Sequence, residues 1–168
     1  NSGSTMPSLL DFPLKNSIIS SLNSESGMNN LYQNLGKDYL YPDPKNMCIF
    51  IDNQNTKRCF SLLKNNFNHW KMAQAFLLFN RGIPQILYGT EVLMSDSLSL
   101  GKNTQVLSDF PGGWNHDKKD AFNNKLSSNE KEAQDFLKTL LVWRKNCKTI
   151  HNGEMKHFSP INNNGLYA

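Results

Sequence analysis

The sequence predicts an α/β fold built on parallel strands. The apolar residues 47–51 are followed abruptly by polar residues that start at Asp52, a pattern typical of a buried parallel strand that ends at an active-site rim. A helical pattern over 67–80 and a second short apolar strand at 86–88 come next. Strand, helix and strand within about 40 residues predict one right-handed parallel βαβ unit.

Length and composition fit one globular domain. The chain has 168 residues, of which 38% are apolar and 19% charged, and this balance suits a sizeable core and does not suggest disorder. The length is too short for a complete (β/α)8 barrel, which needs roughly 200 residues at the least. The net charge of +4 comes from scattered basic residues, so we expect solvated faces and no nucleic-acid partner.

The placement of cysteine and histidine argues against a disulfide-stabilised protein and against a metal-binding one. Three cysteines at irregular spacing do not form a disulfide framework, and the four histidines are not paired with one another or with cysteine, so we expect no metal site and no cofactor. No stretch reaches the ~18 apolar residues of a membrane helix, and we expect no membrane partner. The chain starts at Asn1 in what reads as mid-fold sequence, which leaves export of the parent protein open.

The first forty residues predict a strand end and two helices. Leu9 and Leu10 can end a short strand. Asp11 can cap the helix that follows, and Pro13 is tolerated in its first turn. Apolar residues at helical spacing continue this helix, and a second amphipathic segment ends at Gly36, because glycine readily ends helices.

Cap and breaker residues bound the βαβ unit. Asn66 is placed to cap the helix over 67–80, which is apolar around most of its circumference and is therefore expected to be buried. Pro84 stands at a strand start, where no amide donor is missed. Glu91 follows the second strand at its carboxyl end.

Residues 92–127 form a long connection without strong periodicity, and connections of that length are usually functional loops or disordered. Within it, residues 111–113 read Pro-Gly-Gly, which suits a tight turn. Trp114 follows and presents a large flat face. That face either stacks on a sugar or plugs the interior.

The C-terminal part predicts one long helix and then strands. Ser127 and Glu130 have the spacing of a capping box. The apolar residues after them recur at helical intervals to about Lys145, which makes this the clearest amphipathic helix of the chain. Residues 154–158, with Asn-Gly turns on either side, read as short strands and predict the start of a β domain.

Four motifs, in this order, resemble the catalytic barrel of the α-amylase family of glycoside hydrolases, in particular neopullulanases and cyclomaltodextrinases of the Bacteroidetes type. They are Asp-Phe-Pro-Leu at 11–14, Phe-Ile-Asp-Asn at 50–53, Leu-Tyr-Gly-Thr-Glu at 87–91 and Asp-Phe-Pro-Gly-Gly-Trp at 109–114. The resemblance implies a partial (β/α)8 (TIM) barrel whose last three strand–helix units occupy residues 1–150. It also implies that residues 151–168 are the first strands of a C-terminal β-sandwich domain.

The resemblance further implies where the chemistry lies. Enzymes of this family cleave α-glucans with retention, using a carboxylate nucleophile and a carboxylic acid about 5–5.5 Å apart, and both come from earlier barrel strands that this chain lacks. The family's third acid ends the strand motif Asp-Asn-His-Asp, in which Gln54 here replaces the His and Asn55 the Asp. The resemblance thus implies Asn55 as the catalytic position, with Gln54, Asp52, Asn53 and Arg58 binding substrate.

Four more residues complete the implied site. Trp114 is implied to contact the glucan, while Tyr88, Glu91 and Asp11 support the rim. Asp11 has the alternative role of a helix cap, as above. The implied partners are an α-glucan oligosaccharide and the missing N-terminal part of the barrel. The resemblance implies a periplasmic or extracellular parent, with a cytoplasmic parent as the alternative.

Two hypotheses about function follow from the neutral residue at position 55. Asn has nearly the shape of Asp but no charge, and losing such a group where charge develops costs on the order of 10²–10³ in rate. The first hypothesis is part of a retaining hydrolase of starch, maltooligosaccharides, cyclodextrins or pullulan that is inactive as this chain. The second is a degenerate, non-catalytic homologue that binds glycan or serves as a scaffold. An unrelated α/β domain is a third alternative.

Overall fold

The computed structural model describes residues 8–24, 27–96, 108–123 and 125–159. Strands β1 (Cys48–Ile49) and β2 (Ile83–Pro84) form a parallel two-stranded sheet, and an isolated parallel bridge joins Leu10 to Cys48. Three chain segments therefore run side by side in one direction, with β1 in the middle. This agrees with the predicted α/β class.

The ladder between β1 and β2 explains why a proline is tolerated inside a strand. Ile83 N donates to Met47 O, and Gln85 N donates to Ile49 O, each at 2.8 Å. Amides of successive strand residues point to opposite sides, so the nitrogen of Pro84 faces away from β1. No hydrogen bond of this ladder is lost at Pro84.

The second strand lies earlier than the sequence predicts. We expected it at 86–88, whereas the ladder spans Ile83–Pro84, and residues 86–88 are not assigned to a strand. An apolar segment becomes a strand only where a neighbour pairs with its backbone. Because β1 itself ends at Ile49, it offers no further partner, and the prediction for 86–88 is wrong.

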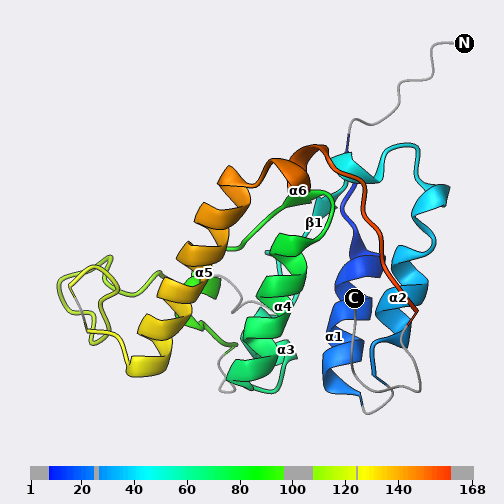
Figure 1. Cartoon of the computed structure of the whole chain (residues 1–168). Coiled ribbons are helices and arrows are strands. Elements are labelled where there is room, and N and C mark those ends of the chain that lie inside the picture. The colour runs from blue at the N-terminus through cyan, green and yellow to red at the C-terminus, as the bar shows by residue number, and fades with distance from the viewer. Residues whose placement is uncertain (1–7, 25–26, 97–107, 124, 160–168) are drawn as a thin grey trace, which may run out of the picture.

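Helices account for most of the regular structure. They are α1 (Phe12–Asn23), α2 (Asn29–Leu35), α3 (Cys59–Leu62), α4 (Phe67–Phe79), α5 (Ser128–Asn146) and α6 (Lys148–Asn152), with short 3₁₀ helices η1 (Asp38–Leu40), η2 (Pro44–Asn46) and η3 (Thr90–Val92). Figure 1 shows α5, α4, α1 and α2 side by side in that order, and each neighbouring pair is in contact.

Three predicted helix caps are confirmed. The Asp11 carboxylate accepts a hydrogen bond from Leu14 N at 2.9 Å at the start of α1. The Asn66 side chain accepts from two amides in the first turn of α4. Ser127 and Glu130 form the capping box of α5. Each cap satisfies amides that the first helical turn leaves without a partner.

The main core lies between the sheet and the helices. Trp70 of α4 is fully buried. Ile49 of β1, Ile51 just after it, and Leu14 and Ile18 of α1 belong to the same cluster. The prediction that α4 is buried holds for one face only, because five of its residues are buried whereas Met72 and Phe79 are exposed. Burial of this apolar surface is what holds the two βα segments together.

A buried ion-pair network ties the start of α1 to the segment just before β2. The Arg81 guanidinium donates to Asp11 at 2.8 Å and to both oxygens of Asp38. The side chains of Arg81 and Asp11 are 6% and 1% exposed. Asp11 therefore caps α1 and pairs with a cation at the same time, so its contacts are those of a structural residue.

A second arginine closes the carboxyl end of α4. Arg144 of α5 donates from Nη1 to Leu78 O at 2.6 Å and Asn80 O at 3.0 Å, and from Nη2 to Gly82 O at 2.6 Å. The last carbonyls of a helix have no partner within the helix. Arg144 supplies donors and a positive charge to this end.

The segment after α5 differs from its prediction. Residues 148–152 form the short helix α6, and the expected strand at 154–158 is not seen, because the described residues pair no neighbouring backbone with it. The rest of the expected β domain, 160–168, lies outside the described residues. Among the described residues, no helix is long and apolar enough to cross a membrane, and no group of three His, Cys, Asp or Glu could hold a metal ion.

Candidate functional site

A tight turn at the carboxyl end of β1 carries the predicted catalytic position. Asn53 N donates to Thr56 Oγ1 at 2.9 Å, and the Asn53 side chain accepts from Asn55 N at 2.9 Å. Asn53 is buried, whereas Gln54 and Asn55 are exposed. The turn is thus held from within, and its two neutral amide side chains face solvent.

Asp52 anchors this turn from below. Its Oδ2 accepts from Cys59 N at 2.7 Å and from the Thr90 hydroxyl at 3.0 Å, and the residue is 2% exposed. Burial raises the pKa of this carboxyl, while the bonds from Cys59 and Thr90 and the charge of Arg58 oppose that rise. Asp52 therefore links the strand end to α3 and η3 and does not face solvent.

At neutral pH, the Asp52→Asn variant is expected to have a free energy of unfolding equal to or higher than that of the wild type. A carboxyl whose folded-state pKa lies above its ordinary value of 3.8 stabilises the folded protein most below that value, and this contribution is lost as pH rises through the folded-state pKa. Asn can still accept from Cys59 N and donate to the Thr90 oxygen. Urea unfolding at about pH 4 and about pH 7 should show that the wild-type protein loses stability relative to Asp52→Asn as pH rises. A wild type that gains stability relative to Asp52→Asn as pH rises would contradict this assignment.

Arg58 connects the turn to the segment after β2. Its Nη1 donates to Tyr88 O, and its guanidinium lies 5.0 Å from the centre of the Tyr88 ring. The residue is 1% exposed, and Nη2 has no hydrogen-bond partner among the described residues. The cation–π contact and the carbonyl hold Arg58 beneath the turn.

Two residues of this cluster were not predicted. Thr90 hydroxyl contacts Asp52, and the Asp96 carboxylate accepts from Arg58 N at 3.1 Å. Thr90 stands inside the motif at 87–91, so the motif could have pointed to it. Asp96 lies in a stretch without a pattern, and no sequence signal marks it.

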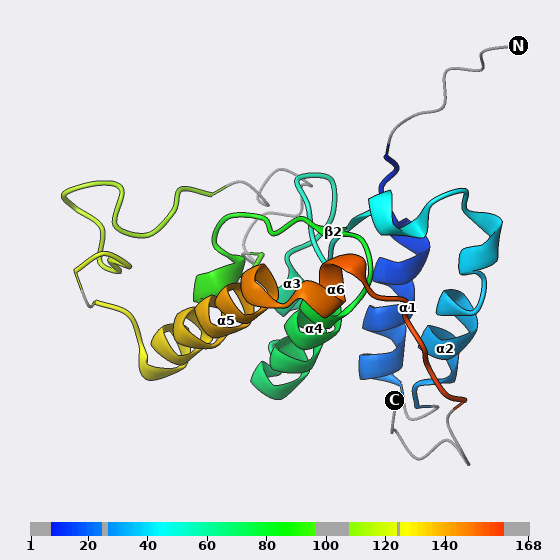
Figure 2. The ribbon, with the colours of Figure 1, turned by 45° about the horizontal axis from the view of Figure 1, so that its top comes forward.

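The remaining predicted residues are spread over the fold. Glu91 is half-buried in η3 beside Thr90, and the Tyr88 hydroxyl donates to Ser108 O at 2.9 Å. Asp11 pairs with Arg81 and caps α1, so its described contacts lie away from the turn at 53–56. Trp114 belongs to the segment 108–123, which projects beyond the N-terminal end of α5 in both views (Figures 1 and 2).

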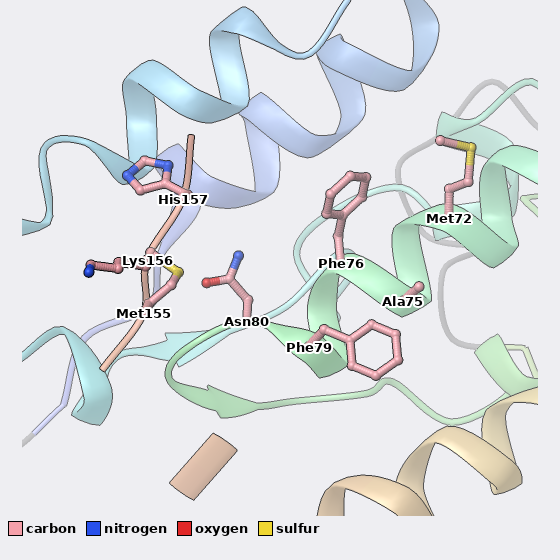
Figure 3. A pocket seen from close by; sticks show the side chains of 8 residues that line it. All are labelled: Met72, Ala75, Phe76, Phe79, Asn80, Met155, Lys156 and His157. Atoms are coloured by element: carbon pink, nitrogen blue, oxygen red, sulfur yellow. The ribbon is translucent and has the colours of Figure 1, made fainter. Parts of the chain in front are cut away.

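The described residues also line a hollow of about 380 Å³ on the outer side of α4. Figure 3 shows Phe76 and Phe79 of α4 on one side and Met155 on the extended segment opposite them. None of residues 52–58 lines it. The hollow is therefore separate from the turn that carries Asn55.

The three parallel segments, the helices packed against them and the polar turn at the end of β1 form part of an α/β barrel. The similar solved structures are enzymes of the α-amylase family, which the chain matches over about nine tenths of its own length. The match spans only about 30% of those chains, as expected for a partial (β/α)8 barrel. No family profile matches the sequence.

Three solved structures illustrate the likeness. An α-amylase from Geobacillus thermoleovorans complexed with acarbose has a TM-score of 0.68 at 22% identity, covering 90% of this chain and 31% of its own. A cyclic α-maltosyl-(1→6)-maltose hydrolase from Arthrobacter globiformis, in complex with that cyclic sugar, has a TM-score of 0.74 at 14% identity, with 94% and 33% covered. A cyclomaltodextrin glucanotransferase, CldA, has a TM-score of 0.65 at 25% identity, with 88% and 27% covered.

Proposed function

We propose that this chain is the C-terminal part of the catalytic barrel of an α-amylase-family hydrolase of the neopullulanase or cyclomaltodextrinase type. Its substrate class is the α-glucans. The observation that carries the proposal is the barrel-like fold over nine tenths of the chain, with Gln54 and Asn55 exposed at the end of β1. That end of a parallel strand is where barrel enzymes bind substrate.

The exposed turn suits sugar recognition more than bond cleavage. Gln54 and Asn55 each offer an amide donor and a carbonyl acceptor, which can bond sugar hydroxyls. Neither carries the charge that strengthens such a bond where the oxocarbenium-like state develops. Asp52 and Asn53, which the resemblance implies as substrate-binding residues, are buried and position the turn. We assign them to support, together with Arg58, Tyr88 and Glu91.

Hydrolysis needs two further acids. Retaining cleavage requires a carboxylate and a carboxylic acid on either side of the glycosidic bond, and the turn presents neither. We infer that they belong to the earlier part of the barrel, which is the partner of this chain. That part would pair with the free edges beside Leu10 and β2. That residues 151–168 begin a C-terminal β domain remains a proposal from the resemblance.

The alternative is a degenerate homologue that binds glycan or serves as a scaffold. The replacement of two neighbouring positions, Gln54 for His and Asn55 for Asp, favours it. A single change could be compensated, whereas paired changes remove both the imidazole and the carboxylate charge that the family uses. The two proposals differ in whether a complete parent cleaves α-glucans.

Sugar release is the test of this proposal. The purified chain of 168 residues is expected to release no reducing sugar from maltoheptaose, pullulan or cyclodextrin, because it presents no acid pair. Asn55→Asp should behave in the same way. Turnover by Asn55→Asp alone would overturn the account. Heat on titration with maltoheptaose would favour retained recognition, and its absence would favour a scaffold.

A further inference from the structure

The segment 108–123 is an ordered loop that is held by its own carboxylates. Asp117 Oδ2 accepts from Gly112 N at 2.9 Å and from Trp114 N at 3.1 Å. Asp120 accepts from the amides of Phe122 and Asn123 at 2.9 and 3.0 Å. Each carboxylate thus fixes a different half of the loop, as short acidic side chains often do in turns.

Gly112 brings the two halves together. It has a φ of +100°, and a Cβ at this position would lie 2.5 Å from Asp120 Oδ1. Ala121 N also donates to Pro111 O at 3.1 Å across the same contact. Only glycine allows both this backbone conformation and this approach. The loop therefore holds its shape through internal contacts while it projects from the helices (Figure 2).

This stiff loop presents aromatic rings to solvent. Trp114 is 59% exposed and Phe122 is 71% exposed. The indole nitrogen of Trp114 donates to Asp109 at 3.2 Å, and Phe122 lies 5.6 Å from Phe110, measured between ring centres. One hydrogen bond thus restrains the Trp114 ring although most of its surface is open. This exposure argues against the alternative role of Trp114 as a buried plug.

We propose that Trp114 is a stacking platform for a pyranose ring of an α-glucan, at a place outside the turn that carries Asn55. A pyranose offers a flat face of C–H groups to an aromatic ring and hydroxyls around its edge. A ring held in place before binding loses little conformational freedom when the sugar arrives. The choice of an α-linked chain rests on the proposed function.

The surroundings of Trp114 favour a sugar over a protein surface. Protein interfaces centre on contiguous apolar patches from which charged residues are depleted. Here Asn115, His116, Lys118 and Lys119 are exposed next to the ring along the chain, and Asp117 lies beneath it. Such polar neighbours suit the hydroxyls at the edge of a sugar.

Indole N–H signals in a proton–nitrogen correlation spectrum provide the test, because the chain has three tryptophans. Trp70 is fully buried, and Trp143 is 41% exposed with its ring packed edge-on against Phe79. Titration with maltohexaose should shift the Trp114 signal saturably and leave the other two in place. Trp114→Ala should weaken binding by about tenfold or more, the change that corresponds to about 1.4 kcal/mol. Trp143→Ala is the matched control and should leave the affinity unchanged.

The remaining outcomes separate this inference from the proposed function. If maltohexaose leaves the Trp114 signal unmoved, or if Trp114→Ala binds as the wild type does, the platform is refuted. Loss of binding only in a Gln54→Ala, Asn55→Ala double variant also refutes it, although the proposed function would then be supported. If cellohexaose shifts Trp114 as strongly as maltohexaose, the platform is upheld for pyranoses and the α-glucan assignment fails.

Discussion

Arg81→Met is expected to lower the free energy of unfolding by about 3–5 kcal/mol, the usual cost of removing one partner from a buried ion pair. Asp11 and Asp38 would both lose the cation, and the Asp11 side chain is 1% exposed, so water cannot readily replace Arg81. The methionine keeps much of the length and none of the charge. Urea unfolding followed by circular dichroism measures the change. If the variant does not fold at all, the absence of the helical signal at zero urea shows the loss of stability directly.

Lys71→Met is the matched control for Arg81→Met. Lys71 also pairs with a carboxylate, Glu132, but the two side chains are 29% and 56% exposed. Exposed pairs of this kind typically contribute about 0–1 kcal/mol. Equal losses in the two variants would mean that the buried Arg81 network contributes no more to the free energy of unfolding than an exposed ion pair does.

Arg144→Met is expected to cost at least about 2 kcal/mol, because each buried acceptor left without a donor costs about 1–3 kcal/mol. Three carbonyls at and just after the end of α4, those of Leu78, Asn80 and Gly82, accept hydrogen bonds from this one side chain. Loss of the contact would loosen α5 from α4. Amide hydrogen exchange at the end of α4 should rise together with the fall in stability.

Two variants sharpen the Arg144 experiment. Arg144→Lys should recover only part of the loss, because a single ammonium cannot reproduce the planar fork of donors. Lys145→Met changes the exposed neighbour on the same helix and should be nearly neutral. A full rescue by lysine would show that charge near the helix end matters more than the three directed bonds.

Local patterns predicted the helices well because their signals lie within a few residues. Asp11, Asn66 and Ser127 were recognised as caps from the next three or four positions, and the structure confirms each one. The position of a strand depends on which other segment pairs with its backbone. The apolar pattern at 86–88 carried no information on which residues would pair with β1. The ladder at Ile83 is therefore a tertiary outcome.

The candidate site was predictable only in part. The rim pattern correctly indicated that Gln54 and Asn55 are exposed. Asp52, two residues before Gln54, is instead buried and accepts a hydrogen bond from Thr90. Contacts between residues far apart in the chain left no signal: Arg81 lies 70 residues from Asp11, and Arg144 lies 66 from Leu78. A lone arginine in a sequence does not reveal which oxygens it will reach.

The proline in β2 limits what can attach to the outer side of this sheet. Since the Pro84 nitrogen carries no hydrogen and faces away from β1, a further chain arriving there finds a gap in the row of donors, and one of its own carbonyls must be satisfied elsewhere. Indiscriminate strand addition, the first step of many fibrils, is disfavoured at such an edge. A strand that pairs with this edge of β2 must therefore tolerate the missing donor at Pro84, which restricts the segments that can pair there.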